Sequence, residues 1–146
     1  MIVRAEIDIN APSEVVWRVF SSLEEWGQWN TACDSCRLTA GERLEPGACL
    51  TFVVKPFVFP VRVAPRVVSC DPGREGVWEG GRWGIHAVHR WRFSARPGGV
   101  RLESTETFGG PLMQAARLLG LQRRLHALTE RMLAQIRTQS EACASG

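Results

Sequence analysis

Two ionisable side chains, His89 and Glu106, lie where the sequence otherwise predicts the apolar faces of two strands. From residue 85 to 93 and again from 100 to 108, apolar and polar residues alternate. Alternate side chains of a strand point to opposite faces of its sheet. The inward positions would be Ile85, Ala87, His89, Trp91 and Phe93, then Val100, Leu102, Ser104, Glu106 and Phe108. A histidine and a carboxylate inside a sheet require a mutual partner, a water-filled cavity or a ligand.

Three chemical roles remain open for this pair. The two groups could satisfy each other in the core, bind a polar group of an otherwise apolar ligand, or act as general acid and base. Burial disfavours an ionised carboxylate and would raise the pKa of Glu106, whereas a nearby imidazolium would lower it. The sequence does not decide between these effects, so the protonation state of the pair stays open.

The size and composition of the chain favour one globular domain. Its 146 residues are 45% hydrophobic and 23% charged, which is ordinary for a domain with a sizeable core. We predict a single domain over residues 1–140 and a flexible tail over 141–146. The net charge of +3 is too weak to indicate nucleic-acid binding.

The five cysteines follow no pattern typical of disulfides. Cys33 and Cys36 form a lone C-x-x-C motif without a second ligand pair, so we expect reduced thiols, no metal and no other cofactor. No apolar run approaches the roughly 20 residues that a membrane-spanning helix needs. The chain begins with a strand pattern rather than a signal peptide. We therefore expect a cytoplasmic protein without integral membrane association.

The order of the elements predicts an α+β fold. Alternation at 2–10 indicates a strand, and two short helices follow at about 12–20 and 23–29. Further strands are indicated at about 36–40, 48–55, 61–70, 75–79, 85–93 and 100–108, and Pro65 marks an edge or bulged strand. An apolar stripe over 111–139 predicts one long helix, in which Gly120 is tolerated, kinks the helix or makes room for a ligand.

Strands that follow one another without intervening helices imply an antiparallel sheet. We predict one curved sheet of about seven strands wrapped around the C-terminal helix, with the short helices closing one end. Such an arrangement leaves room between the sheet and the helix.

Several short sequence motifs, taken in this order, resemble those of the START-like superfamily, also called SRPBCC, which includes birch-pollen-allergen-like proteins, lipid-transfer domains and polyketide cyclases. The motifs are Ile9-Asn10-Ala11-Pro12, Val15-Val16-Trp17, Leu23-Glu24-Glu25-Trp26, Trp29-Asn30, Trp78-Glu79-Gly80, His89-Arg90-Trp91-Arg92-Phe93 and Glu106-Thr107-Phe108-Gly109-Gly110. The resemblance covers nearly the whole chain. It implies a helix-grip fold with a deep hydrophobic cavity under the C-terminal helix. Members bind lipids, sterols, hormones or aromatic molecules, and some cyclise or dehydrate them. This chain has no Tyr, so Tyr-dependent chemistry is excluded.

Carried over by position from this resemblance, the cavity face would include residues of four strands and of the C-terminal helix. They are Leu50, Phe52, Val54, Trp78, His89, Trp91, Phe93, Leu102, Ser104, Glu106, Leu112, Met113, Ala116 and Leu119. Each apolar residue could serve core packing or ligand contact. His89 and Glu106 are the candidate catalytic residues.

Our leading hypothesis is a protein that binds a hydrophobic small molecule (lipid, aromatic or polyketide-like) in this cavity. The alternative is a polyketide cyclase/dehydratase-type enzyme in which His89 or Glu106 moves protons. A third hypothesis is an interaction module that uses the apolar connection Phe57-Val58-Phe59. Whether the chain forms a homodimer is left open.

The arginines of the loop near the expected cavity opening and of the long helix each have two possible roles. Arg82 in the loop is either solvated or contacts an acidic head group of the ligand. The arginines of the long helix either face solvent or are attracted to an anionic membrane surface; they are Arg117, Arg123, Arg124, Arg131 and Arg137.

Overall fold

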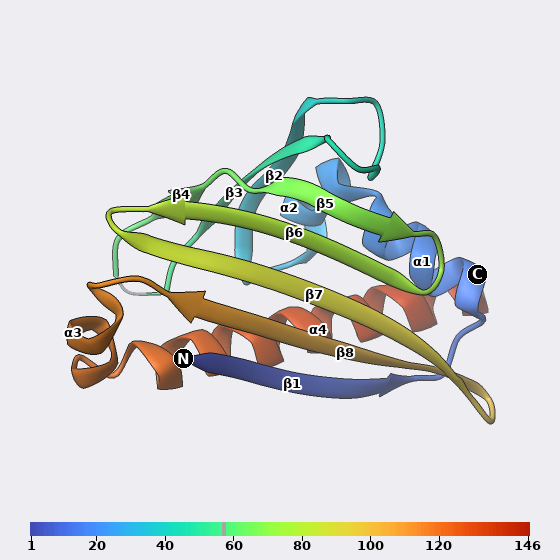
Figure 1. Cartoon of the computed structure of the whole chain (residues 1–146). Helices are drawn as coiled ribbons and strands as arrows, with labels where there is room; N and C mark the ends of the chain where they lie inside the picture. Colours follow the sequence, from blue (N-terminus) through green and yellow to red (C-terminus); the bar gives the residue numbers. More distant parts are fainter. Residues whose placement is uncertain (57) are drawn as a thin grey trace.

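The computed structural model describes residues 1–56 and 58–146, which form a curved sheet around one long helix (Figure 1). The N-terminal part comprises β1 (Ile2–Ile9), α1 (Ser13–Ser21), the 3-10 helix η1 (Leu23–Glu25) and α2 (Trp26–Trp29). Seven strands follow: β2 (Cys33–Ala40), β3 (Cys49–Val54), β4 (Val61–Val63), β5 (Arg66–Asp71), β6 (Glu75–Arg82), β7 (Ile85–Arg96) and β8 (Gly99–Gly109). The chain ends with α3 (Met113–Leu118) and α4 (Leu121–Ser145). Phe57 of the apolar connection singled out in the sequence lies outside the described residues.

The sheet is antiparallel throughout, and its strand order is β1-β8-β7-β6-β5-β3-β2, with β4 paired to β3 beside this path. The first strand lies next to the last one, so β1 and β2 form the two ends of the path. In Figure 1 the red helix α4 runs along the concave side of the sheet, across β1 and β8. This is the predicted helix-grip fold.

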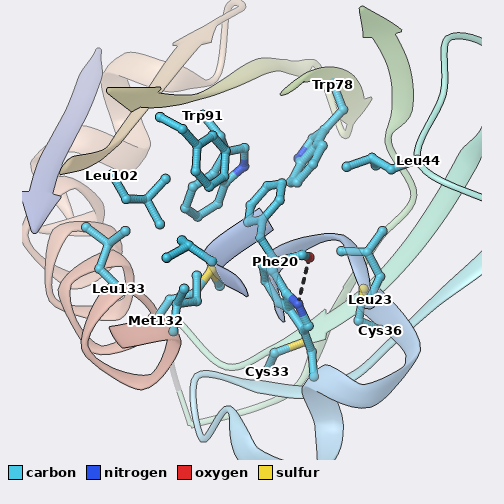
Figure 2. Close-up of a cluster of buried hydrophobic side chains, with 14 of the residues drawn as sticks. Phe20, Leu23, Cys33, Cys36, Leu44, Trp78, Trp91, Leu102, Met132 and Leu133 are labelled. Atoms are coloured by element: carbon cyan, nitrogen blue, oxygen red, sulfur yellow. Dashed lines mark hydrogen bonds between the residues drawn. The ribbon is translucent and has the colours of Figure 1, made fainter. Parts of the chain in front are cut away.

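The core lies between the inner face of the sheet, the short N-terminal helices and the second half of α4. Phe20 of α1 is fully buried at its centre (Figure 2) and packs against five aromatic rings, those of Trp17, Trp26, Trp78, Trp91 and Phe93. Met132, Leu133 and Ile136 of α4 complete this cluster. Aromatic rings bury large apolar areas and gain from offset and edge contacts, so this cluster fixes α1 on the sheet.

Two predicted elements are divided in the structure. The strand predicted over 61–70 is split into β4 and β5 at Ala64-Pro65, so the sheet has eight strands. Pro65 has no N–H for a ladder bond, and its carbonyl accepts a hydrogen bond from the N–H of Leu50 instead. The long helix predicted over 111–139 is also divided, because Gly120 adopts the left-handed conformation (φ 77°) between α3 and α4.

The C-terminal residues are helical as far as Ser145, in the segment for which the sequence predicts a flexible tail. The Glu141 carboxylate accepts a hydrogen bond from the N–H of Asn10. This contact ties the end of α4 to the loop that follows β1.

Candidate functional site

The hairpin of β7 and β8 brings the two ionisable residues together on the inner face of the sheet. Its strands extend to Arg96 and Gly99, which are paired, so the turn is shorter than the segment 94–99 predicted from the sequence. With this register His89 pairs directly with Glu106, and Trp91 pairs with Ser104. Because side chains alternate along each strand, all four residues share the inner face.

Ser104, His89 and Glu106 form a polar line on this face, which we call the polar trio. His89 Nε2 lies 2.7 Å from Ser104 Oγ, within hydrogen-bond distance. Its other ring nitrogen, Nδ1, lies 3.8 Å from Glu106 Oε1, which is too long for a hydrogen bond. The imidazole therefore has one strong partner and keeps its second nitrogen available beside the carboxyl group.

Two tryptophans hold the imidazole in place. The ring of Trp91 stacks on His89 with centroids 4.3 Å apart, and Trp78 meets it edge-on with centroids 5.7 Å apart. Such contacts and the Ser104 hydrogen bond restrict the ring to one orientation. The histidine is thus a positioned group.

Burial determines the protonation states of His89 and Glu106 in the trio. The side chains of His89 and Glu106 are 12% and 20% exposed, and Ser104 is fully buried. Loss of solvation lowers the pKa of His89 to about 3 and raises the pKa of Glu106 to about 7. At neutral pH the imidazole is therefore uncharged, and Glu106 exchanges readily between its acid and carboxylate forms.

The inner face has a packed half and an open half. The packed half, deeper along β7 and β8, includes Trp91, Phe93 and Leu102, which lie in the aromatic core. The open half consists of inward residues that keep partial exposure: Ile85, Ala87, His89, Glu106 and Phe108, and on α4 Leu121, Leu125 and Leu128. The amide of Gln122 donates to the carbonyl of Ile2, which pairs with Thr107, so the start of α4 lies level with Glu106.

The structure places the predicted site residues in four groups. His89 and Glu106 lie in the open half, while Phe52, Trp78, Trp91, Phe93, Leu102 and Ser104 are buried around the packed half, and Val54 packs against its edge. Met113 is buried in α3. Leu112 and Leu119 are 51% and 75% exposed and do not belong to the inner face.

The site residues predicted from the sequence do not include the apolar residues of α4. Leu125 and Leu128 share the helical face of the core residue Met132, at spacings of seven and four residues. The sequence prediction took the first apolar residues after Pro111, because it assumed an unbroken helix. The left-handed Gly120 shifts the helix that covers the sheet to residues further along the chain.

Other features of the described residues lie away from the trio. One hollow of about 540 Å³ is found where α1 begins, beside Ser13 and Arg74, and another of about 410 Å³ on the outer face of the sheet, beside Arg4 and Arg90. Neither is lined by His89 or Glu106. In the part of the chain that the structure describes, no group of three or more His, Cys, Asp and Glu side chains could hold a metal ion.

The C-x-x-C cysteines are buried, unreactive thiols. Cys33 and Cys36 lie in β2 with 2% and 5% exposure. Burial raises the pKa of the Cys33 thiol to about 11 and raises that of Cys36 further. Both therefore remain protonated at neutral pH and act as core residues.

The described helices include none with the length and apolar character needed to cross a membrane.

Comparison with known structures identifies the same fold in several proteins. The protein TTHA0849 of Thermus thermophilus is 21% identical with a TM-score of 0.83, and the match covers 99% of both chains. The Zhui aromatase/cyclase of Streptomyces sp. R1128 is 14% identical with a TM-score of 0.74 over 99% of this chain and 93% of its own. Ara h 8.0201 is 12% identical with a TM-score of 0.67, over 93% of this chain and 97% of its own.

A search of curated proteins finds no sequence match. The family model described as "Polyketide cyclase / dehydrase and lipid transport", however, matches residues 1–141. This match spans the sheet, the polar trio and most of α4, and the structural neighbours include a START superfamily protein of Mycobacterium smegmatis. The chain is therefore a member of the polyketide cyclase / dehydrase and lipid transport family.

Proposed function

We propose that the protein binds a hydrophobic small molecule in the open half of the inner face, with a hydroxyl or carbonyl group of the ligand at Glu106 and His89. The observation that carries this proposal is the polar trio itself, a line of positioned polar groups on an apolar, partly accessible surface. Ligand sites typically combine apolar walls with a few convergent polar atoms. The family description and the aromatase/cyclase neighbours support the same class of ligand.

The polar trio also supports a neutral ligand group over a charged one. His89 is uncharged at neutral pH, and Glu106 in its acid form donates a hydrogen bond while in its carboxylate form it accepts one. A hydroxyl or carbonyl group can pair with one of these forms. An additional fixed charge would lose its solvation without gaining a permanently charged partner.

Binding of matched aromatic molecules tests this proposal. We expect 2-naphthol to bind about five- to tenfold more tightly than naphthalene in calorimetric titrations, because one net hydrogen bond contributes roughly 1 to 1.5 kcal/mol. Glu106→Leu should abolish this preference. The control Glu103→Gln, which alters the outer face of the same strand, should retain it. An undiminished preference in Glu106→Leu would contradict the assigned site, and native mass spectrometry of the purified protein would reveal any ligand carried from the cell.

A second candidate function is catalysis of the polyketide cyclase/dehydratase type. The observation that favours it is a carboxyl group with a pKa of about 7 beside a neutral imidazole, since such groups suit proton transfer near neutral pH. The Glu106 carboxylate would remove a proton from a methylene between two carbonyls. The resulting enolate carbon would attack another carbonyl of the chain, and the alkoxide formed would take the proton back from Glu106.

This alternative predicts turnover that depends on Glu106. With a poly-β-keto thioester as substrate, Glu106→Gln should lower the rate of cyclisation by roughly 10²- to 10⁴-fold, the usual contribution of general acid–base catalysis. Product formation is followed by mass spectrometry, with Glu103→Gln again as the control. Equal rates for the wild type and Glu106→Gln would leave ligand binding as the only function of the site.

A further inference from the structure

One end of the molecule exposes an unusual number of large apolar side chains. They lie on the connection before β4, on the β6–β7 turn and around α3, and they are between 51% and 97% exposed: Val58, Phe59, Trp83, Leu112, Leu118 and Leu119. We call these six residues the apolar rim. Contiguous exposed apolar patches of this kind are uncommon on monomeric proteins and mark interaction surfaces.

The β6–β7 turn lies between β4 on one side and the residues before α3 on the other. Arg82, the last residue of β6, donates a hydrogen bond to the carbonyl of Arg62 in β4. On the other side, Gly110 approaches the Gly84 carbonyl so closely that an added Cβ would collide with it, and a Cβ on Gly84 would lie 3.7 Å from Leu112. Figure 1 shows β4, the β6–β7 turn and α3 at the same end of the molecule. The rim is therefore one surface.

The rim is accompanied by charge of a single sign. Residues 58–63, 82–84 and 110–124 contain five arginines and no Asp or Glu: Arg62, Arg82, Arg117, Arg123 and Arg124. Asp34 and Glu79, two acidic residues of nearby strands, form ion pairs with Lys55 and Arg66. The surface thus combines apolar side chains with a net positive charge.

Trp83 provides a further observation at the tip of the β6–β7 turn. It adopts a positive φ of 53°, a conformation that is disfavoured for a bulky side chain, and the residue is 64% exposed. The Arg82 guanidinium lies 4.1 Å above the centre of that ring. Exposed tryptophan side chains are enriched at membrane–water interfaces, where the amphipathic ring lies at the level of the head groups.

We propose that the apolar rim docks the protein onto a lipid surface that carries anionic head groups. The apolar side chains would enter the boundary between head groups and acyl chains, and the arginines would attract the anionic lipids. The rim segments contain arginines and no acidic residues, which favours an anionic lipid surface over a protein partner, because protein interfaces usually offer pairs of complementary charges. The proposal concerns the outside of the molecule and goes beyond the proposed ligand site.

Vesicle binding without added ligand tests the proposal. We expect the wild type to bind phosphatidylcholine vesicles with 30% phosphatidylserine at least tenfold more tightly than vesicles of phosphatidylcholine alone, as measured by co-sedimentation. The double variant Leu118→Ser/Leu119→Ser should lose at least tenfold in binding. Trp83→Ser should bind more weakly as well, and the wild type should show a blue shift of Trp emission that Trp83→Ser lacks.

A matched pair of charge reversals separates the rim from the net charge of the protein. Arg117→Glu lies within the rim segments, whereas Arg137→Glu makes the same change near the other end of α4. We expect at least a fivefold loss for Arg117→Glu and less than a twofold loss for Arg137→Glu. Equal losses, or no vesicle binding by a wild type that is correctly folded by circular dichroism, would overturn the proposal. A dimer in solution that Leu118→Ser/Leu119→Ser dissociates would instead assign the rim to contact between two copies.

Discussion

The stability of Glu106→Gln relative to the wild type is expected to increase by up to about 3 kcal/mol as the pH rises from 4 to 8. The cause is the raised pKa of Glu106, about 7 in the folded protein against 4.5 as its ordinary value. Between these two values the unfolded chain releases a proton that the folded protein retains. Rising pH therefore favours unfolding of the wild type, and this loss is complete above about pH 7. Glutamine does not ionise, so the variant escapes the loss.

His89 acts in the opposite direction over an overlapping range. Its pKa falls from 6.5 to about 3 on burial, so its contribution to stability is present above pH 6.5 and is lost as the pH falls toward 3. Between pH 4.5 and 6.5 the two effects nearly cancel in the wild type. The comparison with Glu106→Gln is therefore required, since both proteins retain His89.

Urea unfolding at several pH values, followed by circular dichroism, measures this difference. Glu103→Gln is the matched control, because it removes a carboxylate from the outer face of β8 and leaves Glu106 in place. A difference between the wild type and Glu106→Gln that stays constant from pH 4 to 8 would show that Glu106 ionises at its ordinary pKa. In that case the site would not hold a neutral carboxyl group.

Phe20→Ala is expected to lower the free energy of unfolding by about 3 to 5 kcal/mol. The Phe20 ring is fully buried, and its centroid lies 5.0 to 6.0 Å from those of five other aromatic rings. Removing it leaves a cavity between α1 and the sheet that rigid neighbours cannot fill. Because domains are stable by only about 5 to 15 kcal/mol, this loss is a large part of the total.

Chemical denaturation with urea measures the Phe20 effect through the transition midpoint. Leu118→Ala is the control, because it also truncates a large apolar side chain but at a position that is 89% exposed. Its effect should stay within about 0.5 kcal/mol. A Phe20→Ala loss below about 1 kcal/mol would mean that α1 is held mainly by other contacts.

The sheet and the inner face of the candidate site could be predicted from the sequence because alternation is a strong local signal. In β7 and β8 every second residue is apolar apart from the trio, and the structure pairs these two strands. Alternation does not predict the register between β7 and β8, because that register depends on the length of the turn that joins them. The sequence suggested a turn over 94–99, whereas the strands continue to Arg96 and Gly99. The Ser104–His89 hydrogen bond follows from that register and from the rotamers of both side chains.

The division of the C-terminal helix could not be predicted in the same way. An apolar stripe continues through Gly120 at helical spacing, so the pattern alone favours one helix. A glycine is compatible with both a helical and a left-handed backbone, and the structure has the left-handed one at Gly120. Leu112 and Leu119, which the prediction placed on the cavity face, are exposed on either side of α3.

The boundary between the open and packed halves of the inner face implies an upper limit on ligand size. From Ile85 at the start of β7 to His89 the strand advances four residues, which corresponds to roughly 13 Å at about 3.3 Å per residue. Beyond His89 the stacked indole of Trp91 is fully buried in the core. A bound molecule would therefore not extend past His89. Compact fused rings would fit in front of it, and a long acyl chain would have to fold back or extend out of the protein.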